Sequence, residues 1–216
     1  SIYSSGLFPF FSYATPANKE LYLNIIISNC YLKLEENELT VCLSGLISSL
    51  IPGFEDNNES LSSNIYSIFD QIRQKLKRGV FFGTYWSSLL RNKLLRTSGI
   101  KYLSDKIIKY EDYAKLDEEK KKEELENEFP DINNLVVNSL SMLIEEKAIP
   151  TLRTVMDFVI LRFPLTEDNK MISERSKILL IKNALKLLVK NEYSTVRRLN
   201  NWLLGGNNAA IDIKSK

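Results

Sequence analysis

Residues 39–53 read LTVCLSGLISSLIPG, and this stretch decides the fold class. Its apolar side chains recur at i, i+3, i+4, i+7, i+8 and i+11, which is the spacing of one face of an α-helix. The pattern ends at Pro52 and Gly53, a pair that is typical of a helix stop. The sequence therefore predicts an amphipathic helix whose apolar face carries Leu39, Cys42, Leu43, Leu46, Ile47 and Leu50.

The same helical period runs through the rest of the first half of the chain. Thr15 is a favourable N-cap, with Pro16 at the first helical position, and the segment that follows is apolar on two faces. Further helices are predicted by the stripes Leu61, Ile65, Ile68, Phe69, Ile72 and Leu76; Phe82, Trp86, Leu89 and Leu90; and Leu94, Leu95, Tyr102, Leu103, Ile107 and Ile108.

Four more helices are predicted beyond residue 131. Ser173 and Ser194 are favourable N-caps for the last two, and Pro164 and the Gly205-Gly206 pair end helices. The stripes are Ile132, Leu135, Val136, Leu140, Leu143 and Ile144; Leu152, Val155, Met156, Val159, Ile160 and Phe163; Ile178, Ile181, Leu185, Leu188 and Val189; and Val196, Leu199, Trp202 and Leu203. We expect Trp86 and Trp202 to be core residues.

Helices joined by short connections pack antiparallel, and several of these helices are apolar on more than one side. Each pair then needs neighbours on both flanks to bury its surface. The sequence predicts an all-α fold, with antiparallel helix pairs stacked as a degenerate HEAT- or armadillo-like solenoid. Because no repeat of fixed period is visible, a compact irregular helical bundle is the alternative.

The predicted helical domain covers residues 1–206. Residues 110–131 change to Glu, Lys and Asp with little periodic apolar content, which predicts a solvated charged insertion with one exposed helical turn or more. Residues 207–216 are expected to be a flexible tail or linker. The chain begins without Met and enters an apolar segment at once, so we expect a fragment of a longer chain.

Composition limits the classes of function. A formal charge of +2 over 216 residues does not favour wholesale binding of nucleic acid. The chain has no His, no closely spaced cysteine pair and no glycine-rich phosphate loop, so we expect neither an enzyme nor a metal or cofactor site. Cys30 and Cys42 are expected to be reduced core thiols of a cytosolic protein, and no apolar run is long enough to cross a membrane.

Positive charge gathers between residues 71 and 104, where acidic residues are nearly absent. One interpretation is a surface for a partner or an anionic lipid; the other is a set of solvated helix ends, with Arg96 held in a structural ion pair. The candidates for the partner or lipid surface are Arg73, Lys77, Arg78, Arg91 and Lys93, together with Arg197 near the C-terminus.

Two pairs of charged residues near the C-terminus lie on predicted helices. Arg153 and Asp157 are four residues apart, so they share a face and can bridge each other or reach the next helix. Arg197 and Arg198 point about 100° apart on an ideal helix. We therefore predict that Arg198 is fixed structurally to Asp157 or to helix-end carbonyls, and that Arg197 faces solvent and is available to a partner.

Several stretches, in this order along nearly the whole chain, resemble the N-terminal domain of the Dopey family, very large cytosolic proteins of Golgi and endosome traffic. They are LFPFFSYA at 7–14, CLSGL at 42–46, LIPGFED at 50–56, Arg96 with Gly99, Tyr102 and Leu103, RTVMDFVILRFPL at 153–165, and RRL with WLLG at 197–205. The closing motif is the most specific of these.

The resemblance implies a non-catalytic scaffold that recycles membrane proteins between endosomes and the late Golgi. The partners that it implies are a large Golgi helical-repeat protein related to Arf exchange factors, a lipid flippase and kinesin light chain. It also implies a cytoplasmic protein that is peripheral on Golgi, trans-Golgi network and endosome membranes. A membrane-surface module that binds anionic lipid through residues 73–101 is the alternative.

Overall fold

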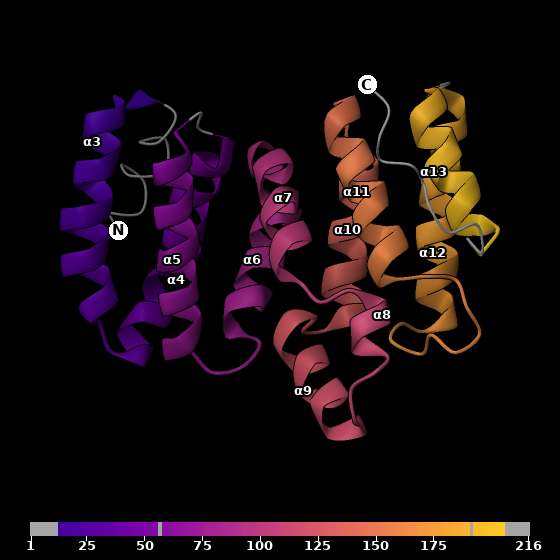
Figure 1. The fold of residues 1–216 in the computed structure, drawn as a ribbon, viewed down its shortest axis with the longest axis horizontal. Helices are drawn as coiled ribbons and strands as arrows, with labels where there is room; N and C mark the ends of the chain where they lie inside the picture. Colours follow the sequence, from indigo (N-terminus) through magenta and orange to yellow (C-terminus); the bar gives the residue numbers. More distant parts are fainter. Residues whose placement is uncertain (1–12, 56–57, 191, 206–216) are drawn as a thin grey trace. The chain divides into compact units, whose positions relative to one another are not determined.

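The computed structural model describes residues 13–55, 58–190 and 192–205, and it is helical throughout their regular elements (Figure 1). No strand occurs among these residues. The prediction of an all-α fold built from helix pairs is confirmed. The motif residues 7–12, residue 56 and the predicted tail at 207–216 lie outside the described residues.

The chain divides into two compact units. The first comprises Ser1–Ile107 and Lys122–Ser139, and the second comprises Ile108–Lys121 and Leu140–Lys216. The charged segment at 110–131 is therefore shared between the units, because its first part belongs to the second unit and its last part to the first.

The first unit begins with a helix that Thr15 caps, since its side chain accepts a hydrogen bond from the backbone N–H of Asn18 at 3.4 Å. Pro16 stands at the first helical position, as predicted. The elements are α3 (Pro16–Leu21), the π-helix η1 (Tyr22–Ile27), η2 (Tyr31–Lys33), α4 (Glu36–Leu50), η3 (Ile51–Glu55), α5 (Glu59–Lys75), α6 (Val80–Arg91), η4 (Lys93–Leu95) and α7 (Arg96–Lys106).

Helix α4 contains the stretch that decides the fold, and it packs against α6. Its predicted stripe is buried at Leu39, Leu43, Leu46, Ile47 and Leu50. The expectation that both cysteines lie in the core is wrong: Cys42 is only half-buried and Cys30 is exposed. Both are free thiols.

An aromatic cluster fills the core of the first unit next to η3. Phe54 stacks on Tyr102 with ring centroids 5.2 Å apart, and Phe69 meets Tyr102 edge-on at the same distance. Tyr85 donates its hydroxyl to the carbonyl of Gly99 at 3.1 Å, which joins α6 to α7. The cluster thus packs α5, α6 and α7 around the turn that follows α4.

The charged segment contains two helices, α8 (Tyr110–Tyr113) and α9 (Glu118–Glu128), followed by the π-helix η5 (Ile132–Val136). Its exposed part is α8 and the beginning of α9, but Glu128 and Phe129 are buried. Trp86 is also buried and donates its indole N–H to the carbonyl of Glu128 at 2.9 Å. The end of this segment is therefore part of the first unit's core and not a solvated insertion.

The second unit contains α8, α11 (Ile149–Arg162), α12 (Glu174–Leu185), η6 (Lys186–Lys190) and α13 (Tyr193–Leu203), and it shares α10 (Val137–Ile144) with the first. Ser173 caps α12 as predicted, since its hydroxyl accepts from the N–H of Ser176 at 3.3 Å. The predicted cap at Ser194 is wrong. Glu192 is the N-cap of α13, because its longer side chain reaches back to the N–H of Thr195 at 2.7 Å.

Candidate functional site

Helices α11 and α13 of the second unit form the layer that holds most of the C-terminal candidate residues. Arg153 pairs with Glu192 at 2.8 Å near the start of both helices, and Arg198 Nε donates to Asp157 Oδ1 at 2.7 Å further along. Beyond the last turn of α11, the buried Trp202 donates to the carbonyl of Phe163 at 2.7 Å. Residue numbers rise together along the three contacts, so α11 and α13 run parallel. The segment that contains α12 connects the end of α11 to the start of α13.

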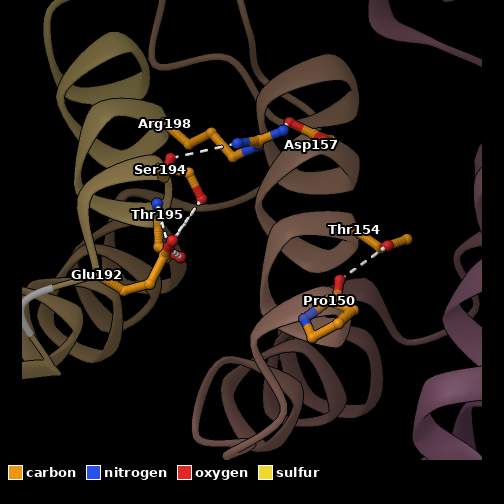
Figure 2. A network of polar contacts seen from close by, with 7 residues as sticks. All are labelled: Pro150, Thr154, Asp157, Glu192, Ser194, Thr195 and Arg198. Carbon is orange, nitrogen blue, oxygen red and sulfur yellow. Dashed lines mark hydrogen bonds and ion pairs between the residues drawn. The ribbon is translucent and has the colours of Figure 1, made fainter. Parts of the chain in front are cut away.

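Glu192 is the centre of a polar network at the start of α13 (Figure 2). Its carboxylate accepts from the backbone N–H and the hydroxyl of Thr195, from the hydroxyl of Ser194 at 2.8 Å and from Arg153. These hydrogen bonds, that of the Thr195 hydroxyl first, hold the pKa of Glu192 well below its usual value. The carboxylate is therefore charged at neutral pH and fixes the first turn of α13.

Arg198 is held from two sides, as Figure 2 shows. Besides its contact with Asp157, its Nη1 donates to the carbonyl of Ser194 at 3.3 Å, one turn earlier in the same helix. The side chain is 20% exposed and that of Asp157 is 46% exposed. Arg198 therefore joins α13 to α11 and has little surface to offer a partner.

Arg197 is exposed, in contrast to its neighbour. It shares the outward side of α13 with Tyr193 and Leu204, whose side chains are 80% and 84% exposed. Tyr193 and Arg197 are four residues apart and share one side of α13, and Leu204 directly follows the last residue of this helix. We call Tyr193, Arg197 and Leu204 the α13 outer face. Tyr and Arg are the residue types most often found at the energetic centre of protein interfaces.

The structure places several residues of the basic stretch against acidic groups. Arg73 lies 3.7 Å from Asp70 and stacks over the ring of Phe82. Arg78 pairs with Glu123 at 2.9 Å, so the charged segment supplies the acid that is absent from residues 71–104. Both arginines are thus partly neutralised by acids that lie outside the stretch itself.

Arg96 is buried and anchors the end of a helix. Its Nε donates to the carbonyl of Leu89 at 3.0 Å, and its Nη2 donates to that of Leu90 at 3.1 Å, in the last turn of α6. A cation at a helix C-terminus satisfies carbonyls that lack an intrahelical donor and interacts favourably with the helix dipole. Its role within the first unit is therefore structural.

Lys77, Arg91 and Lys93 are exposed. The backbone N–H of Lys77 donates to the carboxylate of Glu36 at 3.1 Å, which brings another acid to this region. Arg91 and Lys93 flank the turn between α6 and η4, beside Leu94, which is 87% exposed. Acids thus lie beside several residues of the basic stretch, while Arg91 and Lys93 are exposed at the turn between α6 and η4.

No group of three or more His, Cys, Asp or Glu side chains among the described residues is arranged to hold a metal ion. No described helix combines the length and the apolar composition needed to cross a membrane.

Glu192, which makes the most polar contacts of this site, is not among the residues that the sequence predicts. Glu is not a favoured N-cap, and its partner Arg153 lies 39 residues away, so neither local spacing nor residue type indicates the contact. The spacing of Glu192 and Thr195, which matches N-cap and N3, is the one signal in the sequence that could have found it.

Comparison with known proteins supports the motif-based resemblance. The family model described as "Dopey, N-terminal" matches residues 1–208. The chain is 26% identical over 207 residues to "Protein DOP1 homolog" of Drosophila melanogaster, 25% over 225 residues to "Protein DOP1B" of Xenopus laevis, and 26% over 239 residues to "Protein DOP1" of Saccharomyces cerevisiae.

These alignments cover 94%, 100% and 95% of the chain, but only 7%, 9% and 14% of the relatives. The chain thus spans a small fraction of their length. No solved structure matches it. Because the family model covers nearly the whole sequence, the chain belongs to the Dopey family and corresponds to its N-terminal domain.

Proposed function

We propose that this chain is a non-catalytic binding domain of a trafficking scaffold, which acts in the recycling of membrane proteins between endosomes and the late Golgi. Membership of the Dopey family suggests a role in trafficking, and the names of the matched relatives denote no enzyme. Family membership over residues 1–208 is the observation that carries the proposal. The helix pairs supply the extended surface that a scaffold needs.

The proposed partners are those that the family resemblance implies: a large Golgi helical-repeat protein related to Arf exchange factors, a lipid flippase and kinesin light chain. The proposed location is the cytoplasmic side of Golgi, trans-Golgi network and endosome membranes. We assign partner contact to the α13 outer face, because Arg197 is exposed there between two exposed apolar side chains. The ion pairs behind it, between α13 and α11, keep this face rigid before binding.

Charge reversal on the full-length protein tests this assignment. Arg197→Glu should reduce co-purification of Golgi partners, while Lys170→Glu, at another exposed cation of the same unit, should leave it unchanged. Thermal unfolding of both variants should match the parent protein, since neither position has an ion pair among the described residues. Equal partner recovery from both variants would remove Arg197 from the interface.

The membrane-surface alternative depends on the cations of residues 73–101. This alternative is weakened by two ion pairs, Arg73 with Asp70 and Arg78 with Glu123, which partly neutralise the basic stretch. It is favoured by the exposed side chains of Arg91, Lys93 and Leu94. Flotation of residues 1–216 with anionic liposomes decides between the two. The alternative is supported if the protein floats in a salt-sensitive manner and the double variant Arg91→Glu, Lys93→Glu does not float. It is excluded if the parent protein does not float at low salt.

A further inference from the structure

Helix α12 and the turn η6 of the second unit have an unusual distribution of side chains. Their inward side carries the buried apolar residues Leu180, Ala184 and Leu187, together with the buried polar residues Ser176 and Asn183. Four large apolar residues nevertheless lie on the outward side: Ile178 is 65% exposed, Leu185 41%, Leu188 43% and Val189 87%. We call these four residues the α12 outer face. Large apolar side chains that gather on the exposed side of a helix indicate a surface that another element covers.

Basic residues outnumber acidic residues around this face. Between residues 174 and 190 the chain carries the cations Arg175, Lys177, Lys182, Lys186 and Lys190, and the single acid Glu174. Three of these cations have partners within the unit: Lys177 pairs with Glu174, Lys186 pairs with Glu145, and Lys190 donates to the carbonyl of Glu146.

The other two cations, Arg175 and Lys182, are exposed and have no acidic partner among the residues that the structure describes. Lys182 lies between Ile178 and Leu185 on the helix, at i+4 from the first and i−3 from the second, so it stands within the apolar face. A surface of this kind is complementary to an amphipathic helix that carries an acidic residue opposite Lys182.

We propose that the α12 outer face is covered in the full-length protein by a helix of the same polypeptide, from the region that follows the Dopey N-terminal domain. The matched region is the N-terminal part of the family, and it amounts to 7% and 14% of the fly and yeast relatives, so most of such a chain follows it. Stacked helix pairs bury each apolar side against the next pair in sequence.

A helix of the same chain is favoured over a separate partner for an energetic reason. An intramolecular helix is present at high effective concentration and loses little translational freedom on docking, so a small face is enough. The inference does not depend on the partner surface proposed above, because it concerns α12 and η6, whereas that surface lies on α13.

Site-specific photo-crosslinking of the full-length protein tests the occupant. A photo-reactive phenylalanine analogue is placed at position 185, or at position 188 if the first variant is poorly expressed, with position 167 as the control. Residue 167 is an exposed Glu in the connection between α11 and α12. The expected result is a crosslinked peptide from beyond residue 216 of the same molecule at position 185 or 188, and none at position 167.

Each alternative occupant gives a distinct result. Mixing isotope-labelled and unlabelled chains separates a second copy from the same molecule, and mass spectrometry identifies crosslinks to lipid or to another protein. Any of these, or no crosslink above the control, would overturn the proposal. As a second measurement, Lys182→Glu should reduce the intramolecular crosslink from position 185, and an unchanged yield would contradict the acidic contact.

Discussion

Arg198 Nε lies 2.7 Å from Asp157 Oδ1 and joins α13 to α11, while the adjacent Arg197 points into solvent. Two neighbouring arginines of one motif thus have different roles in this structure. We predict that Arg198→Ala lowers the free energy of unfolding by about 1–2 kcal/mol, less than the 3–5 kcal/mol of a fully buried pair because Asp157 is 46% exposed.

Arg197→Ala should change the free energy of unfolding by less than about 0.5 kcal/mol. Chemical denaturation of both variants measures the difference, and the Asp157→Ala, Arg198→Ala double-mutant cycle isolates the pair itself. Equal losses at the two arginines would refute the structural role of Arg198.

A second prediction concerns pH. The pKa of Glu192 is lowered in the folded state from a reference value of 4.5, so the ionised carboxylate stabilises the fold above that pH. The advantage of the parent protein over Glu192→Gln should be complete at pH 7 and should decrease as the pH falls below about 4.5. Unfolding midpoints of the two proteins between pH 3 and pH 7 test this, and a constant difference across that range would contradict it.

A third prediction compares two helical glycines of the first unit. A Cβ on Gly99 would come within 2.3 Å of Leu89 Cδ2, and Leu89 is fully buried, whereas a Cβ on Gly83 would meet Pro130 at an ordinary 3.5 Å. Gly99→Ala should therefore cost about 1–3 kcal/mol, and Gly83→Ala should be neutral or stabilising by up to about 1 kcal/mol. The denaturant midpoints of both variants measure this difference. If Gly99→Ala were as stable as the parent protein, Leu89 would be able to move away from the new methyl group.

A fourth prediction separates the two parts of the charged segment. Phe129→Ala should destabilise the protein by about 3–5 kcal/mol, because the ring is fully buried in the first unit. Glu119→Ala, in the exposed first turn of α9, should change stability by less than about 0.5 kcal/mol. If Phe129→Ala unfolded at the same denaturant concentration as the parent, the end of this segment would not belong to the core.

Most helices were predictable from the sequence because their apolar period and caps are local signals. The stripe predicted for α12 is wrong, since Ile178, Leu185, Leu188 and Val189 are exposed. The stripe of α4, the Thr15 cap and the Ser173 cap all lie within a few residues of the structure they specify. The burial of Phe129 was not predictable in this way, since it follows a run of charges. Its neighbour Glu128 accepts a hydrogen bond from Trp86, which lies 42 residues earlier in the sequence.

The candidate site was predictable only in part, for the same physical reason. The different directions of Arg197 and Arg198, about 100° apart, follow from helix geometry. The neutralisation of Arg78 by Glu123, and that of Arg153 by Glu192, depend on which helices become neighbours, and no local spacing encodes that.

The most direct test of the central claim is proximity labelling by the full-length protein in cells, with Arg197→Glu compared with Lys170→Glu. A trafficking scaffold should label Golgi and endosome proteins, and Arg197→Glu alone should lose label from the partners that contact α13. If the parent protein labelled no Golgi or endosome proteins, the proposed role in traffic would be contradicted.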